Sequence, residues 1–213
     1  NVNLYYMNYN NQLVLTGQLN DVGAYVRDNV ADSYRAGIEI DGAYKFTPKF
    51  TLGGNLAISR NKIAEFTEFI DDYSTDEFFQ EEINYTNTDI GFSPNIVGSA
   101  ILDYKLFKNF EISLLNKHVG SQYMDNTMND NRKLDAFWTT DLRLNYALEP
   151  SFVKNIDFTL MVYNVFNRLY EPNGYTFSYF LPGEGGAGRV LATENFYYPM
   201  AGTNFLAGVK IRF

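Results

Sequence analysis

The chain of 213 residues is long enough for one substantial domain, carries a net charge of −8 and contains no cysteine. The negative charge argues against nucleic-acid binding, which needs a basic surface, and the lack of cysteine excludes disulfides and thiolate metal sites. No apolar run approaches the roughly 20 residues of a membrane-spanning helix. Aromatic residues nevertheless make up 17% of the chain, and such a content is typical of proteins that meet a membrane–water interface.

The first predicted strands cover residues 2–16 and 33–46, and the second has the clearer pattern. Its apolar and charged side chains alternate with a period of two, which a helix would not produce. One face carries Tyr34, Ala36, Ile38, Ile40, Tyr44 and Phe46, and the other carries Arg35, Glu39, Asp41 and Lys45. At about 14 residues the strand exceeds the roughly 9–11 that cross a bilayer, so we expect it to project beyond the membrane.

The alternation continues, more weakly in most segments, through residues 50–64, 95–107, 110–123, 137–148, 156–170 and 203–213. In segment 137–148, Trp138 and Tyr146 lie near opposite ends of the apolar face, as expected for two aromatic girdles. Residues 156–167 are apolar on both faces, so we expect one of those faces to pack on something inside a barrel. These segments predict eight antiparallel strands.

The connections alternate in length. Residues 47–49, 108–109 and 150–155 form short turns, whereas residues 17–32, 65–93, 124–134 and 171–202 are long, polar and rich in Gly, Asn and Asp. Short turns at one end and long loops at the other are typical of bacterial outer-membrane barrels. The predicted fold class is therefore all-β, a transmembrane antiparallel β-barrel.

Three segments, at residues 8–17, 117–126 and 162–171, resemble strands from the C-terminal part of TonB-dependent receptors. The most specific element is the Asn-Val-Phe-Asn-x-x-Tyr pattern at residues 164–170, followed by a final strand that ends in Phe213. The resemblance extends over essentially all of residues 1–213. It implies one barrel segment, about the last eight strands of a 22-stranded barrel, without the plug domain, the TonB box or the earlier strands.

This resemblance implies TonB-energised uptake of a scarce nutrient, such as a metal chelate, cobalamin or an organic oligomer, across the outer membrane of a Gram-negative bacterium. The implied partners are the rest of the barrel and its plug, the TonB complex acting through that plug, and outer-membrane lipids. The barrel assembly machinery should recognise the last strand through Val209, Ile211 and Phe213. A surface lipoprotein is a further candidate partner, and no nucleic-acid partner is expected.

The alternative is a self-contained eight-stranded outer-membrane barrel with a structural or adhesive role, since eight is the smallest even number of strands that closes. An outer-membrane enzyme is disfavoured, because no Ser/His or paired-carboxylate arrangement stands out. The single histidine, His118, is expected to be a polar lumen or interface residue. We predict no catalytic residue, no metal site and no cofactor, and we interpret the glycine-rich residues 183–188 as a loop tip.

Two segments are candidates for ligand contact. Residues 65–91 carry nine carboxylates and no basic side chain, which suits either a solvated acidic loop or a cation-attracting loop at a pore mouth, such as a Ca²⁺ site. The second segment is a long loop whose aromatic residues either bind a ligand or extend the strands and girdle. The candidate ligand-binding residues in it are Tyr175, Phe177, Tyr179, Phe180, Tyr197 and Tyr198, with Phe196 beside them.

Overall fold

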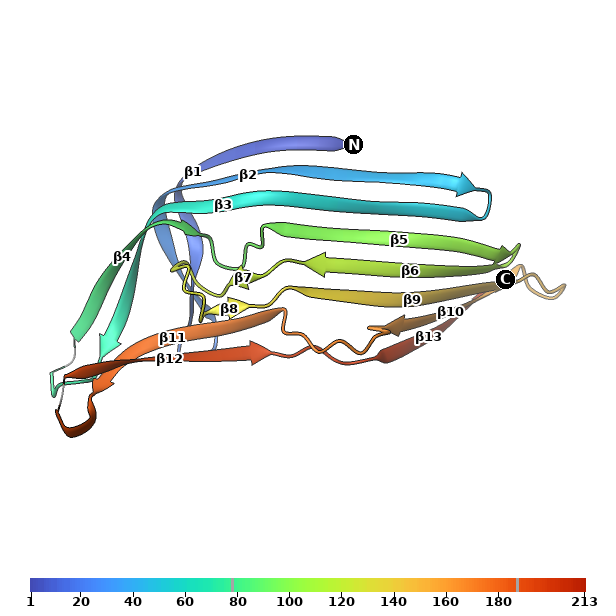
Figure 1. Ribbon diagram of the computed structural model, residues 1–213. Helices are drawn as coiled ribbons and strands as arrows, with labels where there is room; N and C mark the ends of the chain where they lie inside the picture. Colours follow the sequence, from blue (N-terminus) through green and yellow to red (C-terminus); the bar gives the residue numbers. More distant parts are fainter. Residues whose placement is uncertain (78, 187) are drawn as a thin grey trace.

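The computed structural model describes residues 1–77, 79–186 and 188–213. Its main feature is an antiparallel sheet in the order β1-β2-β3-β5-β6-β9-β10-β13 (Figure 1). The strands are β1 (Val2–Leu19), β2 (Tyr25–Thr47), β3 (Phe50–Asp72), β5 (Ile96–Phe107), β6 (Phe110–Val119), β9 (Phe137–Leu148), β10 (Asn155–Tyr163) and β13 (Asn204–Arg212). All eight predicted strands are thus confirmed in the predicted order, and β4, β11 and β12 add three further strands to the same sheet.

The sheet has one apolar face that continues from strand to strand. Directly opposed residues of neighbouring strands lie on the same side of a sheet, so the register extends each face across all eight strands. Ile38 lies opposite Leu4 and Ile58, and Leu144 lies opposite Ile112 and Leu160. We call this side the apolar face; its members include Leu4, Ile38, Ile58, Leu102, Leu114, Leu144, Leu160 and Val209.

The opposite side, the polar face, carries hydrogen-bonded and charged side chains together with some aliphatic ones. Arg35 donates to Asn61 and Ser93, each at 3.1 Å. Arg143 donates to Ser113 at 3.0 Å, and Ser113 donates to Asp103 at 2.5 Å. The predicted alternation of apolar and polar side chains is therefore confirmed, and it gives the sheet one face suited to an apolar medium and one suited to a polar medium.

The short connections lie together at one end of the sheet, where the predicted turns are confirmed. Aromatic rings gather on the apolar face near this end, with ring centroids 4.8 Å apart for Tyr44 and Phe46 and 6.2 Å apart for Phe110 and Tyr146. Trp138, at the other end of β9, has 57% of its surface exposed and lies 5.7 Å from the His118 ring. This spacing of aromatics along β9 fits the two predicted girdles.

Three of the four predicted long loops are largely strand, so that prediction is wrong in detail. Strands β2 and β3 each run for 23 residues, roughly twice the 9–11 needed to cross a bilayer. Residues 79–89 form β4 (Phe79–Asp89), which pairs with the far half of β3. Residues 171–202 fold into the hairpin of β11 (Asn173–Pro182) and β12 (Arg189–Tyr198), with a 3₁₀ turn at Glu184–Gly186. Segment 124–134 contains only the end of a small ladder between β7 (Gln122–Tyr123) and β8 (Lys133–Leu134).

The predicted strand at residues 156–170 ends at Tyr163, because the Asn-Val-Phe-Asn motif forms a turn. Asn164 and Asn167 have φ of 49° and 51°, the left-handed region that Asn tolerates better than most residues. The Asn164 side chain closes this turn by donating to the Arg168 carbonyl at 2.9 Å and accepting from the Arg168 amide at 2.9 Å. The two apolar faces expected for residues 156–167 are also reduced, because Asp157 and Thr159 lie on the polar face opposite Lys210 and Gly208.

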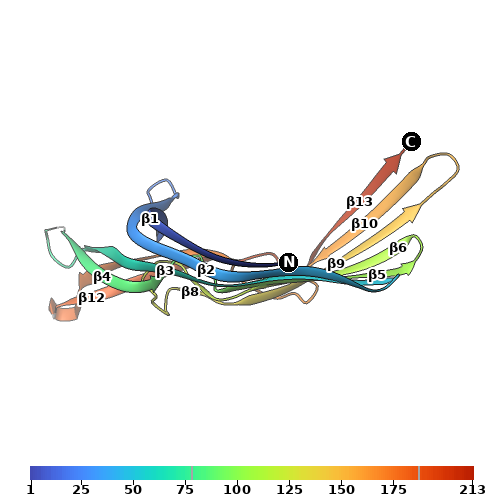
Figure 2. The ribbon, with the colours of Figure 1, turned by 90° about the horizontal axis from the view of Figure 1, so that it is seen from above.

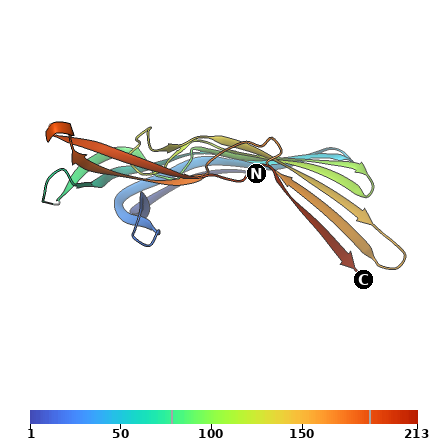
Figure 3. The same cartoon turned by 90° about the horizontal axis from the view of Figure 1, so that it is seen from below.

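The sheet is an open, curved layer, as the two views turned from Figure 1 show (Figures 2 and 3). Strands β1 and β13 lie at its two edges, and no pairing joins them within the described residues. The eight strands therefore do not close on themselves as the eight-stranded alternative requires. Among the residues described, no helix is long and apolar enough to cross a membrane.

Candidate ligand-binding cleft

The long hairpins meet at the end of the sheet opposite the short turns (Figure 1). Strand β11 pairs in parallel with the tip of β3, with Tyr179 opposite Asp71 and Phe180 opposite Asp72. The Tyr73 amide also donates to the Phe180 carbonyl at 2.9 Å. The β3–β4 and β11–β12 hairpins, distant in sequence, thus form one continuous structure.

A buried arginine fastens this junction from one side. Arg132, whose side chain is 3% exposed, donates to Glu68 at 2.5 Å, to Asp125 at 2.7 Å and to Ser178 at 2.5 Å. Tyr85 donates to the second oxygen of Glu68 at 2.9 Å. Burial and the neighbouring Glu68 carboxylate raise the pKa of Tyr85, so its hydroxyl stays a donor. We call Arg132, Glu68, Asp125 and Ser178 the arginine node; it links β3, β11 and segment 124–134.

A second arginine fastens the hairpin tips. Arg189, at the start of β12, donates to the fully buried Asp72 at 2.6 Å and also pairs with Glu81 of β4. Its guanidinium lies 4.0 Å from the centroid of the Phe180 ring. Although burial opposes ionisation of Asp72, hydrogen bonds from Ser74 and Arg189 keep its pKa below the ordinary value.

These contacts settle how several carboxylates of residues 65–91 are used. Glu68, Asp72 and Glu81 pair with the two arginines, and Asp89 pairs with Lys62 at 2.8 Å. The segment is a strand hairpin rather than a solvated loop. Within the described part of the chain, no group of three or more His, Cys, Asp or Glu side chains could hold a metal ion.

Aromatic rings cover one face of the β11–β12 hairpin. The Tyr175 ring lies 6.5 Å from Phe177 and 4.7 Å from Phe196, and Phe177 lies 6.0 Å from Tyr179. Tyr198 completes the group at 6.0 Å from Tyr175. We call Tyr175, Phe177, Tyr179, Phe196 and Tyr198 the aromatic ladder.

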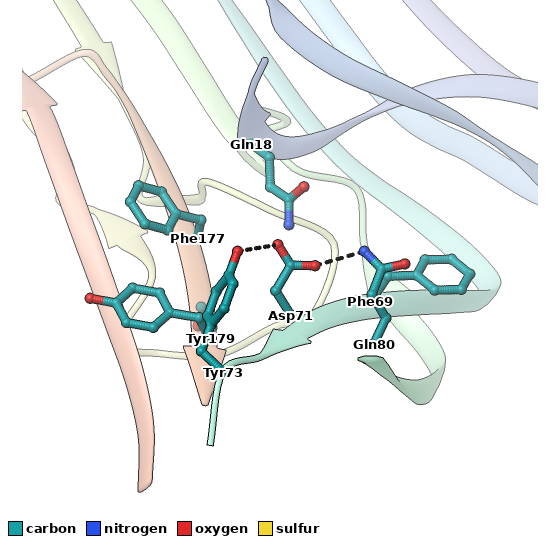
Figure 4. A pocket seen from close by; sticks show the side chains of 8 residues that line it. Gln18, Phe69, Asp71, Tyr73, Gln80, Phe177 and Tyr179 are labelled. Atoms are coloured by element: carbon teal, nitrogen blue, oxygen red, sulfur yellow. Dashed lines mark hydrogen bonds between the residues drawn. The ribbon is translucent and has the colours of Figure 1, made fainter. Parts of the chain in front are cut away.

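A cleft of about 470 Å³ lies between the ladder and the β3–β4 hairpin (Figure 4). The Asp71 carboxylate is at its centre, where it accepts from Gln80 at 2.7 Å and from the Tyr73 hydroxyl at 3.2 Å. The Gln18 amide, from β1, points towards it from the other side. The lining residues are Gln18, Phe69, Asp71, Tyr73, Gln80, Phe177, Ser178 and Tyr179. The volume lies in the range of small-molecule sites, and rings surrounding a few polar groups are typical of such sites.

The predicted aromatic candidates fall into two groups. Tyr175, Phe177, Tyr179 and Tyr198 share the ladder face, and two of these line the cleft. Phe180 and Tyr197 lie on the opposite face of the hairpin, where Phe180 is 9% exposed and packs against Arg189. Ligand contact by all six candidates stays a prediction.

Sequence reasoning missed the polar part of the cleft and the arginine node. Asp71 was counted only as one of many carboxylates, while Gln18 and Gln80 lay in predicted loops. Arg132 was the one arginine in a long polar segment between predicted strands, which is the only signal that could have singled it out.

The predicted assembly signal lies on the edge strand β13. Val209 faces Phe158 and Ile211 faces Ile156 on the apolar face, with 61% and 50% of their surfaces exposed. Phe213 follows the strand and is 85% exposed. The three side chains are accessible as a recognition signal requires, and their recognition stays a prediction.

Comparison with known proteins gives a consistent result. The model of the family described as "TonB dependent receptor-like, beta-barrel" matches residues 1–165. Among solved structures, the ferric-catecholate import receptor Fiu from E. coli K12 aligns with 100% of this chain at 18% identity and a TM-score of 0.62. The siderophore receptor PiuA from Acinetobacter baumannii aligns at 14% identity with a TM-score of 0.65. The copper transporter OprC aligns at 18% identity with a TM-score of 0.63, and both alignments cover 100% of this chain. The chain spans only 25%, 26% and 28% of those proteins respectively, so the likeness shows a shared fold.

Proposed function

The chain belongs to the TonB-dependent receptor β-barrel family of the Gram-negative outer membrane, and we propose that it forms barrel wall and extracellular hairpins of an active-transport receptor. The receptor takes up a scarce nutrient with energy supplied through TonB. In this proposal residues 1–213 supply about eight strands of a larger barrel, and a plug domain and further strands complete it. The chain binds and guides a ligand and performs no covalent chemistry.

The observation that carries the proposal is the two-faced open sheet with long hairpins at one end only. Its apolar face suits lipid, and its polar face suits a water-filled or plug-filled lumen. The hairpins extend well past the length needed to cross a bilayer, which supports a cleft outside the membrane, where a ligand would arrive.

The proposed partners follow from the two faces and the edges. Outer-membrane lipids contact the apolar face, the plug contacts the polar face, and neighbouring strands of the same barrel pair with β1 and β13. The TonB complex acts through the plug. The barrel assembly machinery recognises Val209, Ile211 and Phe213, and a surface lipoprotein is a further partner to be sought at the hairpin end.

Uptake in living cells tests the proposal. Deleting the gene should abolish growth on one limiting nutrient from a panel of ferric chelates, cobalamin and oligosaccharides. Deleting tonB or collapsing the proton gradient should have the same effect. Unchanged growth on every nutrient, or uptake that persists without TonB, would contradict it.

A further inference from the structure

Building on the proposed uptake function, we propose that the cleft around Asp71 binds a neutral, polyhydroxylated ligand, namely a ring of an oligosaccharide. The argument rests on three properties of the cleft: its charge, its fixed hydrogen-bonding groups and its flanking aromatic rings.

The charge of the cleft disfavours an anionic ligand. Its described lining residues include the carboxylate of Asp71 and no Lys, Arg or His. The adjoining cleft, of about 280 Å³, is lined by Arg27, Asp28 and Arg132, and of these described residues only Arg132 forms ion pairs, with Glu68 and Asp125. An anionic metal chelate in the Asp71 cleft would therefore meet a negative group with no cation among that cleft's described lining residues, which costs binding energy in a partly desolvated site.

The polar groups of the cleft are positioned to form hydrogen bonds with adjacent hydroxyl groups of a ligand. Gln80 and Tyr73 each donate to a different oxygen of Asp71 and so hold the carboxylate in place. A carboxylate has about four acceptor positions, so further hydrogen bonds from a ligand remain open to Asp71. The Gln18 amide across the cleft offers both a donor and an acceptor (Figure 4). A fixed carboxylate facing an amide matches adjacent hydroxyls, each of which donates and accepts.

Aromatic rings provide the apolar part of the site. Phe69 and Phe177 line the same cleft as Asp71 and come from two different hairpins. A sugar ring has C–H surfaces as well as hydroxyls, so it can pack against rings while its hydroxyls reach the polar groups. The ladder continues from Phe177 to Tyr175 on the same strand face, 6.5 Å away, which extends this surface beyond one ring. An oligosaccharide is long enough to contact this extended aromatic surface, whereas a single small ring is not.

Binding to the full-length receptor, purified in detergent from outer membranes, tests the assignment. The probes are maltohexaose, xylohexaose and laminarihexaose, with an anionic ferric tris-catecholate complex for comparison, and the method is isothermal titration calorimetry. We expect at least one hexasaccharide to bind, and Asp71→Asn to weaken it by about tenfold or more, since hydrogen bonds to charged groups are among the stronger ones. Phe177→Leu, which keeps an apolar side chain, should weaken it as well. The matched control is Asp76→Asn, an exposed carboxylate of the same hairpin that does not line the cleft, and it should leave the affinity unchanged.

The inference would be overturned if no hexasaccharide binds, or if Asp71→Asn and Phe177→Leu both leave the hexasaccharide affinity unchanged. It would also be overturned if only the anionic complex binds and Asp71→Asn strengthens the binding of that complex. Equal receptor levels in the outer membrane show that each variant folds. The wider function fails separately: if TonB-dependent uptake of a metal chelate is lost on gene deletion while no hexasaccharide binds, only the ligand class is wrong. If gene deletion changes no uptake, the uptake function itself is wrong.

Discussion

The membrane-crossing part of the sheet and its hairpin end use charged residues in different ways. On the polar face of the sheet, ion pairs are loose, with 3.6 Å between Arg143 and Asp103 and 3.7 Å between Arg212 and Asp157. At the hairpin end, Arg132 contacts two buried carboxylates at 2.5 and 2.7 Å. The sheet is stabilised by hydrogen bonds between its strands and by the lipid and water on its two faces. The packing of the hairpins against one another instead depends on contacts of specific side chains. Mutations should therefore have different consequences in the two regions.

The largest effect is expected at the arginine node. Arg132→Ala leaves Glu68 and Asp125 buried without their cation, and breaking a buried pair in this way costs about 3–5 kcal/mol. The hairpins should become sensitive to added protease, while the heat-resistant mobility of the barrel on SDS gels should not change. Arg132→Lys is the matched control and should retain part of the protection. Equal protease resistance of Arg132→Ala and the wild type would show that the node does not fasten the hairpins.

On the sheet, the corresponding change is a charge on the apolar face. Leu144→Arg places a guanidinium among Ile112 and Leu160, and such a change costs about 2–4 kcal/mol near the bilayer midplane. Urea unfolding of the full-length receptor in lipid vesicles measures this loss. Asn145→Arg, one residue along on the polar face, should cost much less. If the two variants were equally stable, the assignment of the faces would be wrong.

A smaller effect is expected where β1 contacts segment 124–134. Gly17 has φ of 95°, and an added Cβ would lie 2.7 Å from the Asp125 Cβ and 2.9 Å from the Met124 carbonyl oxygen. Gly17→Ala should cost about 1–3 kcal/mol through strain and overlap. Gly23 also has positive φ, at 78°, but nothing lies within 4 Å of its added Cβ, so Gly23→Ala isolates the backbone strain. Protease sensitivity should rise more for Gly17→Ala, and the reverse order would contradict the described contact.

The smallest effect appears only in acid. The pKa of Asp72 is lower in the folded hairpin than in an unfolded chain, so its ionised form stabilises the fold above the ordinary pKa. That contribution is lost as the pH falls from the ordinary value through the lowered folded value. Protease sensitivity near β12 should therefore increase below about pH 4. Asp72→Asn should remove this dependence, and an identical acid profile in that variant would assign the effect to another group.

The sequence predicted the sheet better than the hairpin end, for a physical reason. Each side chain of the sheet faces either lipid or water, and its polarity matches the medium that it faces. The alternation at residues 33–46 therefore shows both faces of the sheet in consecutive residues. The arginine contacts depend on residues far apart, since Arg132 binds Glu68 across 64 positions and Arg189 binds Asp72 across 117. No local pattern carries that pairing. The turn at Asn164 was missed because its neighbours Val165 and Phe166 continue the apolar character of the preceding strand, although two Asn residues three apart were a usable signal for positive φ.

The parallel pairing of β11 with β3 also has a consequence for the order of folding. It joins Tyr179 to Asp71, two residues that lie 108 positions apart in the sequence. Closing so long a loop costs entropy that local hairpins avoid, and contacts of this kind form late. We therefore expect the β11–β12 hairpin to dock after the sheet strands have entered the membrane. The contact of Arg132 with Ser178 would then form only after docking, whereas the Arg132 pairs with Glu68 and Asp125 need no residue of this hairpin.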